Sequence, residues 1–89
     1  MWKPIEGFDN YEVSDAGEVR NTKYNRLLTP SQGPGGYLRV NLRKDKKSYH
    51  QYVHRLVASA FLMGEGEVNH LNGNRADNRV ENLEWTTHQ

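Results

Sequence analysis

Residues 37–63 read YLRVNLRKDKKSYHQYVHRLVASAFLM, and the hydrophobic period changes partway along this segment. Every second residue from Leu38 to Leu42 is apolar, which predicts a strand with one buried face. The charged run at 43–47 predicts a hairpin tip, and 48–53 the return strand. From 54 to 63, apolar residues recur three and four positions apart, which predicts one short amphipathic helix. The segment therefore predicts a β-hairpin that leads directly into a helix.

Shorter elements are predicted on the N-terminal side of this segment. Apolar and polar residues alternate on both sides of Asp15-Ala16-Gly17, a tripeptide whose composition favours a turn. We therefore expect a short hairpin over residues 11–19. Tyr24-Asn25 predicts a second turn. Proline and glycine favour irregular structure over residues 2–8 and a loop over residues 31–36.

Two further short strands are predicted on the C-terminal side. Val68 begins the first strand, and Asn72-Gly73 predicts a chain reversal after it. Asp77-Asn78 offers a cap for the segment that follows, where the alternation of Leu83 and Trp85 predicts the last strand. The expected fold class is α+β, with small antiparallel β-hairpins and a short helix.

The composition places the chain among small proteins with a thin core. The 89 residues are enough for one domain, and 35% of them are hydrophobic while 26% are charged. Because there is no cysteine, disulfides, cysteine-ligated zinc and cysteine nucleophiles are excluded. No apolar run is long enough to cross a membrane, and residues 1–19 carry too many acids for a signal peptide. We therefore expect a soluble, cytoplasmic protein with no membrane partner.

The charged residues are segregated along the chain. The net charge is −4 over residues 1–19, +8 over residues 20–55 and −3 over residues 56–89. A central block this basic favours binding to a polyanion, because its lysines and arginines would neutralise the phosphates of such a partner. The alternative is a solvated basic face that keeps a small protein soluble.

Two pairs of residues are candidates for metal or catalytic chemistry. His50 and His54 have the spacing of two helical zinc ligands, but the predicted strand at 49–53 would hold them about 13 Å apart at ~3.3 Å per residue. Asn69-His70 lies at a strand end just before an asparagine-rich turn. There, an imidazole could deprotonate water, and the amide oxygen beside it could hold a hard cation. The alternative is that His70 packs in the core and the asparagines serve the turn.

Both halves of the chain resemble one known family. In the C-terminal half, the resemblance is carried by Val53-His54-Arg55-Leu56-Val57-Ala58, Ala60-Phe61, Val68-Asn69-His70-Leu71-Asn72-Gly73-Asn74, Asn78, and Glu81-Asn82-Leu83-Glu84-Trp85-Thr86. In the N-terminal half, it is carried by Trp2, Ile5-x-Gly7-Phe8, Tyr11-x-Val13-Ser14, Gly17-x-Val19-Arg20 and Gly36-Tyr37. These motifs resemble the HNH endonucleases of phages and introns, which include homing endonucleases, together with the module that usually precedes their catalytic domain.

The resemblance implies a fold and a role for three residues. The fold is the ββα-metal motif, in which two short strands and a helix surround one divalent ion. His70 matches the general base that activates water against a DNA phosphodiester, and Asn69 matches a metal ligand. Asn82 matches the middle asparagine, which supports the loop. The implied cofactor is Mg²⁺, with Mn²⁺ as the second possibility, because Mg²⁺ prefers oxygen ligands.

The resemblance also implies a partner and a domain division. Residues 1–53 would form a β-rich DNA-binding module, and residues 54–89 the HNH motif, packed as one unit. The partner is double-stranded DNA, a monomer is favoured, and the setting is the cytoplasm of a bacterial or phage-infected cell. The expected phosphate contacts come from the basic hairpin and the helix start: Arg39, Arg43, Lys44, Lys46, Lys47 and Arg55. For Arg55, a structural role at the helix start is the alternative.

One departure from the family pattern concerns the last motif ligand. The family places a final histidine or asparagine about nine residues beyond Asn82, near position 91, whereas the sequence ends at Gln89. We therefore expect the motif to be truncated at its C-terminal helix, with His88 as the nearest substitute ligand. The rival functions are a DNA-binding relative with impaired catalysis and a small phage protein that contacts another protein.

Overall fold

The computed structural model describes residues 1–86, which form three small antiparallel sheets around one α-helix. In chain order the elements are β1 (Trp2–Ile5), β2 (Phe8–Ser14), β3 (Val19–Asn21), β4 (Arg26–Leu27), β5 (Ser31–Gln32), the 3₁₀ turn η1 (Pro34–Gly36), β6 (Leu38–Lys44), β7 (Lys47–Tyr52), α1 (Val53–Phe61), β8 (Glu67–His70), η2 (Val80–Asn82) and β9 (Leu83–Thr86). The predicted α+β class is confirmed.

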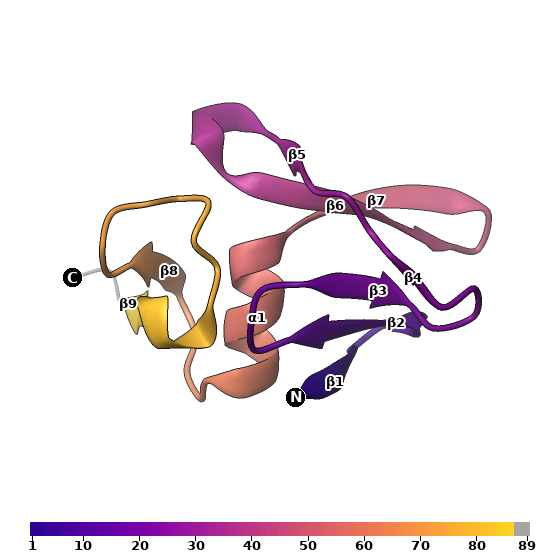
Figure 1. Ribbon diagram of the computed structural model, residues 1–89, viewed down its shortest axis with the longest axis horizontal. Helices are drawn as coiled ribbons and strands as arrows, with labels where there is room; N and C mark the ends of the chain where they lie inside the picture. The colour runs from indigo at the N-terminus through magenta and orange to yellow at the C-terminus, as the bar shows by residue number, and fades with distance from the viewer. Residues whose placement is uncertain (87–89) are drawn as a thin grey trace.

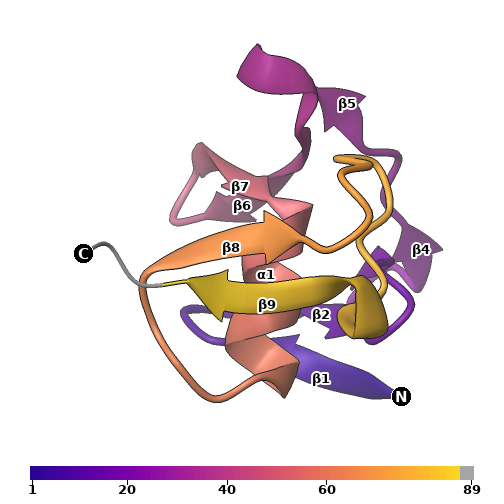
Figure 2. The ribbon, with the colours of Figure 1, turned by 90° about the vertical axis from the view of Figure 1, so that its left-hand side faces the viewer.

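Helix α1 lies at the centre of the molecule. The β8–β9 pair lies on one side of it and the sheet β1-β2-β3-β4 on the other, with the hairpin of β6 and β7 above (Figure 1). In the perpendicular view, β8 and β9 cross in front of the helix (Figure 2). Because α1 contacts strands of all three sheets, its apolar face supplies the middle of a shared core.

The core is built from the alternating faces that the sequence predicts. Val40 and Leu42 of β6 are buried while Asn41 and Arg43 between and beyond them are exposed. Ten buried side chains form the cluster: Ile5, Tyr11, Val13, Val19, Val40, Leu42, Val53, Leu56, Val57 and Leu83. Since these residues come from both halves of the chain, the two halves share one core.

The hairpin of β6 and β7 is the longest paired element. Its register pairs Arg39 with Tyr52 at one end and Lys44 with Lys47 at the other, so the tip is the two-residue loop Asp45-Lys46. Both tip residues have positive φ, 52° and 66°, as in the turns that match strand twist. The tip lies at the end of the hairpin that is far from α1 (Figure 1).

Several element boundaries differ from the sequence predictions. Residues 2–5, predicted to be irregular, form strand β1, and the predicted loop at 31–36 contains β5 and η1. The helix spans 53–61 rather than 54–63. No helix within the described residues is long and apolar enough to cross a membrane.

Candidate functional site

His70 ends β8 with its imidazole inside the protein. The residue is 7% exposed, and its Nε2 lies 2.8 Å from Oδ1 of Asn78, which is itself 5% exposed. An amide oxygen can only accept a hydrogen bond, so in this arrangement Nε2 carries the hydrogen and donates it. The other ring nitrogen of a neutral His70, Nδ1, then carries a free lone pair.

Nδ1 of His70 is the nitrogen that the protein leaves available. Within residues 1–86 this nitrogen has no hydrogen-bond partner. It is also not fully buried, whereas Arg39 Nε and His54 Nδ1 are both fully buried and without a partner among these residues. A histidine fixed through one nitrogen and free at the other has the arrangement that a general base requires.

The rings of Tyr37 and His54 lie against His70, and the ring of Tyr52 joins the cluster through its contacts with both. The ring of Tyr37 lies 5.9 Å from that of His70 and 5.0 Å from that of His54, and the two imidazoles are 5.2 Å apart. Tyr52 closes the group at 5.6 Å from His54. Because Tyr37 and Tyr52 flank the basic hairpin, the hairpin and the HNH-like segment meet at this cluster.

His54 is a neutral member of the cluster. The pKa of its imidazole is lowered to about 4, chiefly by burial and in smaller part by the nearby His70 and Arg55. His54 is the second residue of α1 and packs against the other rings, and no described side chain caps the helix start.

Asn82 closes the loop that follows His70. Its Nδ2 donates to Asn72 Oδ1 at 3.0 Å and to the Asp77 carbonyl at 2.9 Å, while its Oδ1 accepts from the Asn72 amide at 3.1 Å. The Leu71 amide donates to the Asn82 carbonyl at 2.8 Å. These bonds match the predicted cross-loop role of Asn82, which is 6% exposed.

The proposed cap at Asp77-Asn78 is wrong. No side chain caps η2, because Asn78 is engaged by His70 and Asp77 binds Arg79 at 2.8 Å through both carboxylate oxygens. Arg79 accordingly holds the pKa of the Asp77 carboxyl well below its usual range. The asparagine-rich loop is instead ordered by Asn72 and Asn74, whose side-chain oxygens accept from backbone amides two residues on.

Asn69 lies on the other face of β8 from His70. It is exposed, and its Nδ2 donates to Glu84 Oε1 at 3.0 Å across the β8–β9 pair. Since a carboxylate can only accept, Glu84 orients the amide, and Oδ1 of Asn69 has no partner within the described residues. The structure thus gives Asn69 an available oxygen but does not bring it into contact with His70.

The metal-binding groups are sparse. The described residues hold no cluster of three or more histidine, cysteine, aspartate or glutamate side chains that could bind a metal. One carboxylate oxygen, Glu84 Oε1, lies 3.0 Å from the Nδ2 of the Asn69 amide. His88, the suggested substitute ligand, lies outside the described residues. His50 is exposed on β7 and His54 is buried, so the structure does not assemble the rejected zinc pair.

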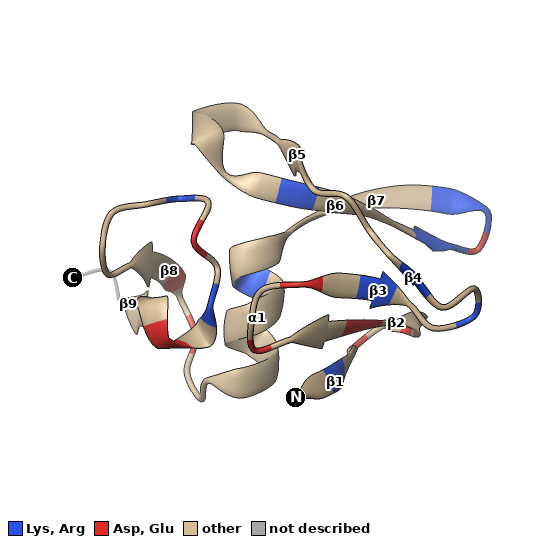
Figure 3. Ribbon diagram, viewed as in Figure 1, with Lys and Arg blue, Asp and Glu red and all other residues tan. Residues whose placement is uncertain are grey.

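The basic hairpin tip is exposed and free of ion pairs. Arg43, Lys44, Lys46 and Lys47 are all exposed, and none forms a salt bridge with another described residue. Blue ribbon gathers at the β6–β7 tip and on β3 and β4, while red lies near β9 and on the β2–β3 side (Figure 3). The positive charge of the tip is therefore available to a phosphate backbone.

Two other basic residues predicted to meet phosphates have protein contacts. Arg39 is half-buried, with its side chain packed against Gly33, and its buried Nε has no partner. Arg55 donates to the Gly66 carbonyl at 3.3 Å, and its guanidinium lies 5.9 Å from the Trp85 ring centre. Arg55 thus makes the structural contacts that the sequence left as its alternative.

Four residues of the site were not singled out by the sequence for their contacts there: Asn78, Tyr37, Glu84 and Arg75. Arg75 donates to the Gly35 carbonyl and lies over the Tyr37 ring at 4.7 Å. Tyr37, Asn78 and Glu84 are in the segments that carry the family resemblance, which was the available signal. Their contacts at the site could not be predicted from the sequence, because these contacts depend on how the chain folds back on itself.

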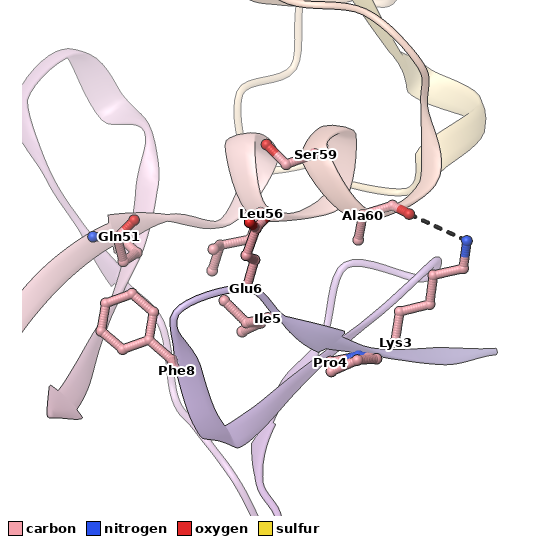
Figure 4. Close-up of a pocket in the computed structure, with 9 residues that line it drawn as sticks. All are labelled: Lys3, Pro4, Ile5, Glu6, Phe8, Gln51, Leu56, Ser59 and Ala60. Atoms are coloured by element: carbon pink, nitrogen blue, oxygen red, sulfur yellow. Dashed lines mark hydrogen bonds between the residues drawn. The ribbon is translucent and has the colours of Figure 1, made fainter.

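A separate cleft lies between β1 and α1 (Figure 4). Its lining comprises Lys3, Pro4, Ile5, Glu6, Phe8, Gln51, Leu56, Ser59 and Ala60, and Lys3 Nζ donates to the Ala60 carbonyl at 3.2 Å. The cleft shares no residue with the cluster around His70, so it is not part of the candidate catalytic site.

Two family models match the chain in succession. Residues 1–43 match the NUMOD4 motif, and residues 51–89 match the HNH endonuclease family. The first match ends in the basic hairpin, and the second begins just before α1 and contains His70.

Curated relatives match over nearly the whole chain. An uncharacterised HNH endonuclease of Acanthamoeba polyphaga mimivirus, L247, is 44% identical over 95 residues, covering 98% of this chain and 24% of the relative. The DNA endonuclease I-HmuI of Bacillus phage SP01 is 40% identical, with 97% and 52% covered. The H-N-H endonuclease F-TflII of Escherichia phage T5 is 36% identical, with 99% and 48% covered. The chain therefore spans between a quarter and about half of these relatives.

A solved structure has the same fold. The HNH homing endonuclease I-HmuI, in a study of its DNA binding and cleavage, superposes with a TM-score of 0.91 at 40% identity. The match covers 98% of this chain and 52% of that one. The similarity thus includes the arrangement of the elements as well as the order of the motifs.

Proposed function

The chain belongs to the HNH endonuclease family, with a NUMOD4 motif before the HNH segment, and we propose that it hydrolyses phosphodiester bonds in DNA. The observation that carries the proposal is the setting of His70. Its Nε2 is engaged by Asn78 at 2.8 Å, and Nδ1 is left free within the described residues. A relative that had lost this chemistry would have no need of an imidazole fixed in this way.

His70 acts as the general base in this proposal. Its Nδ1 takes a proton from a water molecule while the water oxygen forms a bond to phosphorus. The bond from phosphorus to the leaving oxygen breaks, and the leaving oxygen takes a proton from solvent. A neutral imidazole is needed for this step. The neighbouring His54, whose pKa is lowered to about 4, is itself uncharged at neutral pH, so it places no positive charge beside the proton that His70 gains.

HNH endonucleases generally use a divalent metal ion, and we propose Mg²⁺, with Mn²⁺ as a substitute. The donors present fit a hard cation, because Asn69 Oδ1 has no partner within the described residues and the Glu84 carboxylate lies beside its amide. When bound, the metal would stabilise negative charge on the phosphate and the leaving oxygen. Asn69 is the proposed ligand, and Glu84 sets the orientation of its amide.

Asn82 supports the catalytic loop in this proposal and binds no metal. Its side chain makes three hydrogen bonds that tie Asn72 and Asp77 to the start of β9. The loop that leaves His70 is therefore held at both ends. We propose that this fixes the direction in which His70 faces the scissile phosphate.

The proposed partner is double-stranded DNA, bound along the length of the molecule by a monomer. The exposed basic residues at the hairpin tip, which form no ion pair within residues 1–86, are Arg43, Lys44, Lys46 and Lys47. Arg39 lies toward the other end of β6, opposite Tyr52. The longest dimension is 38 Å, which corresponds to roughly 11 base pairs at ~3.4 Å each. Contacts to that many phosphates would make the affinity fall steeply with salt.

Plasmid nicking with Mg²⁺ or Mn²⁺ tests the proposed function. The unchanged chain is compared with His70→Ala and with His50→Ala, a matched control because His50 is exposed on β7. We expect nicking that EDTA abolishes, that His70→Ala lowers about 100-fold or more, and that His50→Ala leaves intact. DNA binding without cleavage in either metal would instead support the binding-only alternative.

A further inference from the structure

We propose that Asn78 is a positioning residue for His70, and that the turn at residues 14–18 of the N-terminal module holds Asn78 in place. The hydrogen bond between His70 Nε2 and Asn78 Oδ1, 2.8 Å long, joins two residues that are both more than nine-tenths buried. The effect of this positioning on catalysis rests on the proposed function. The structural link between the turn and the His70 imidazole, which we call the coupling, does not. The N-terminal module would then be part of the catalytic site and would do more than bind DNA.

The first link in the coupling is the contact between Gly17 and Asn78. A Cβ on Gly17 would lie 2.9 Å from the Asn78 carbonyl oxygen and 3.0 Å from its carbonyl carbon. The backbone of Asn78 therefore lies directly on this glycine. A second tie lies two residues on, where the Val80 amide donates to the Asp15 carbonyl at 2.9 Å.

The second link is the rigidity of the turn itself. Ser14 is 3% exposed, and its hydroxyl oxygen accepts from the Ala16 amide at 3.2 Å and from the Glu18 amide at 3.0 Å. The Ser14 amide donates to the Glu18 carbonyl at 2.8 Å, and the Gly17 amide donates to the Ser14 carbonyl at 3.0 Å. A turn with four internal bonds is a firm support for the segment lying on it.

The third link is the ring of Tyr37, which belongs to the same N-terminal module. It lies 5.9 Å from the His70 ring, and the guanidinium of Arg75 lies over it at 4.7 Å. The module thus reaches His70 twice, through Asn78 at Nε2 and through Tyr37 at the ring. Two separate contacts can fix both the position of the imidazole and its rotation.

The tautomer of His70 reports on this coupling without any measurement of cleavage. In a neutral imidazole, the nitrogen that carries the hydrogen and the nitrogen that does not have distinct ¹⁵N chemical shifts. These shifts are recorded at a pH well above the ordinary histidine pKa of about 6.5. We expect the Nε2–H form in the unchanged chain. We also expect it in Asn78→Asp, whose carboxylate still accepts, and a mixture of tautomers in Asn78→Leu, which fills the space without an acceptor.

Two glycine variants test the role of the turn. Gly17 and Gly7 have nearly the same φ, +88° and +85°, but a Cβ on Gly7 would meet nothing within 4 Å. Gly17→Ala and Gly7→Ala therefore carry similar backbone strain, and only the first pushes on Asn78. We expect Gly17→Ala alone to lose the single tautomer and to slow cleavage at saturating DNA about 100-fold, with DNA affinity unchanged.

The outcomes separate this inference from the proposed function. A single Nε2–H tautomer that persists in both Asn78→Leu and Gly17→Ala would overturn the positioning role, whatever the cleavage rates. Equal effects of Gly17→Ala and Gly7→Ala would overturn the role of the turn, because strain alone would then explain them. If both variants lose the single Nε2–H tautomer but the unchanged chain does not cleave DNA, the link between the turn and His70 would be supported and the proposed nuclease function contradicted.

Discussion

Acidification should destabilise the protein through His54 before most carboxylates are protonated. The folded protein holds the pKa of His54 at about 4, chiefly by burying it, whereas an unfolded chain would have the ordinary value of about 6.5. Between these two values the unfolded state binds more protons than the folded state. Stability from this residue is therefore fully present above about pH 6.5 and is lost as the pH falls toward about 4.

The size of the effect follows from the two pKa values. The difference corresponds to a loss of about 3 kcal/mol of unfolding free energy by about pH 4, of which about 2 kcal/mol is lost by about pH 5. The residue is 8% exposed, so solvent screens this term little. For a domain whose stability is of the order of 5–15 kcal/mol, the loss is a large fraction of the whole.

Urea unfolding followed by tryptophan fluorescence, repeated across this pH range, measures the effect. His54→Phe keeps a ring in the cluster and removes the titratable group. Between about pH 6.5 and about pH 4, its unfolding free energy should therefore fall by about 3 kcal/mol less than that of the unchanged chain. It also removes the buried Nδ1 that has no partner. His50→Phe, on an exposed site, should keep the slope of the unchanged chain. Equal slopes in the unchanged chain and in His54→Phe would show that titration of His54 does not cause the pH dependence of stability.

Three further changes test the hairpin, the loop and the core. Lys44→Ala with Lys46→Ala should weaken binding to all DNA sequences alike and flatten the dependence on salt; a loss confined to one target would contradict a phosphate role. Asn82→Ala should lower the unfolding free energy by about 2 kcal/mol, because it leaves loop groups without partners. Leu42→Ala should cost about 3 kcal/mol in the same urea assay, since the side chain is fully buried. A loss of unfolding free energy near zero in Asn82→Ala or Leu42→Ala would show that the loop or the core, respectively, is packed differently.

The hairpin and helix were predictable because their signals are local. The alternation from Leu38 to Leu42 and the change to a helical period at residue 54 lie within one continuous segment. The helix ends two residues early, at Phe61, with Leu62 already extended. The indole of Trp85 donates to the Leu62 carbonyl at 3.1 Å, a contact from β9 that the helical period could not reveal.

Strand β1 was missed because proline and glycine were interpreted as breakers. Pro4 does sit in a strand, but β1 is at the edge of its sheet, where a missing N–H group is tolerated. The register shifts between Pro4 and Ile5, as expected for a bulge at such a position. Which strand lies at an edge is a property of the assembled sheet and not of the local sequence.

The candidate site was predictable in part. The resemblance identified His70 and Asn82, and the structure gives Asn82 the cross-loop bonds predicted for it. Asn78 and Tyr37 reach His70 across 8 and 33 positions of the sequence, and neither contact has a periodic signal. The roles of His70 as general base, of Asn69 as metal ligand and of the basic hairpin in DNA binding stay predictions.

Chemical rescue of His70→Ala by imidazole is a direct test of His70 as the general base. Removing the buried ring leaves a space beside Asn78 that free imidazole can enter as a replacement base. We predict that Mg²⁺-dependent nicking, lost in His70→Ala, returns in proportion to added imidazole, while the His50→Ala control is unaffected. Full nicking by His70→Ala without imidazole would contradict the account, because the base would then lie elsewhere.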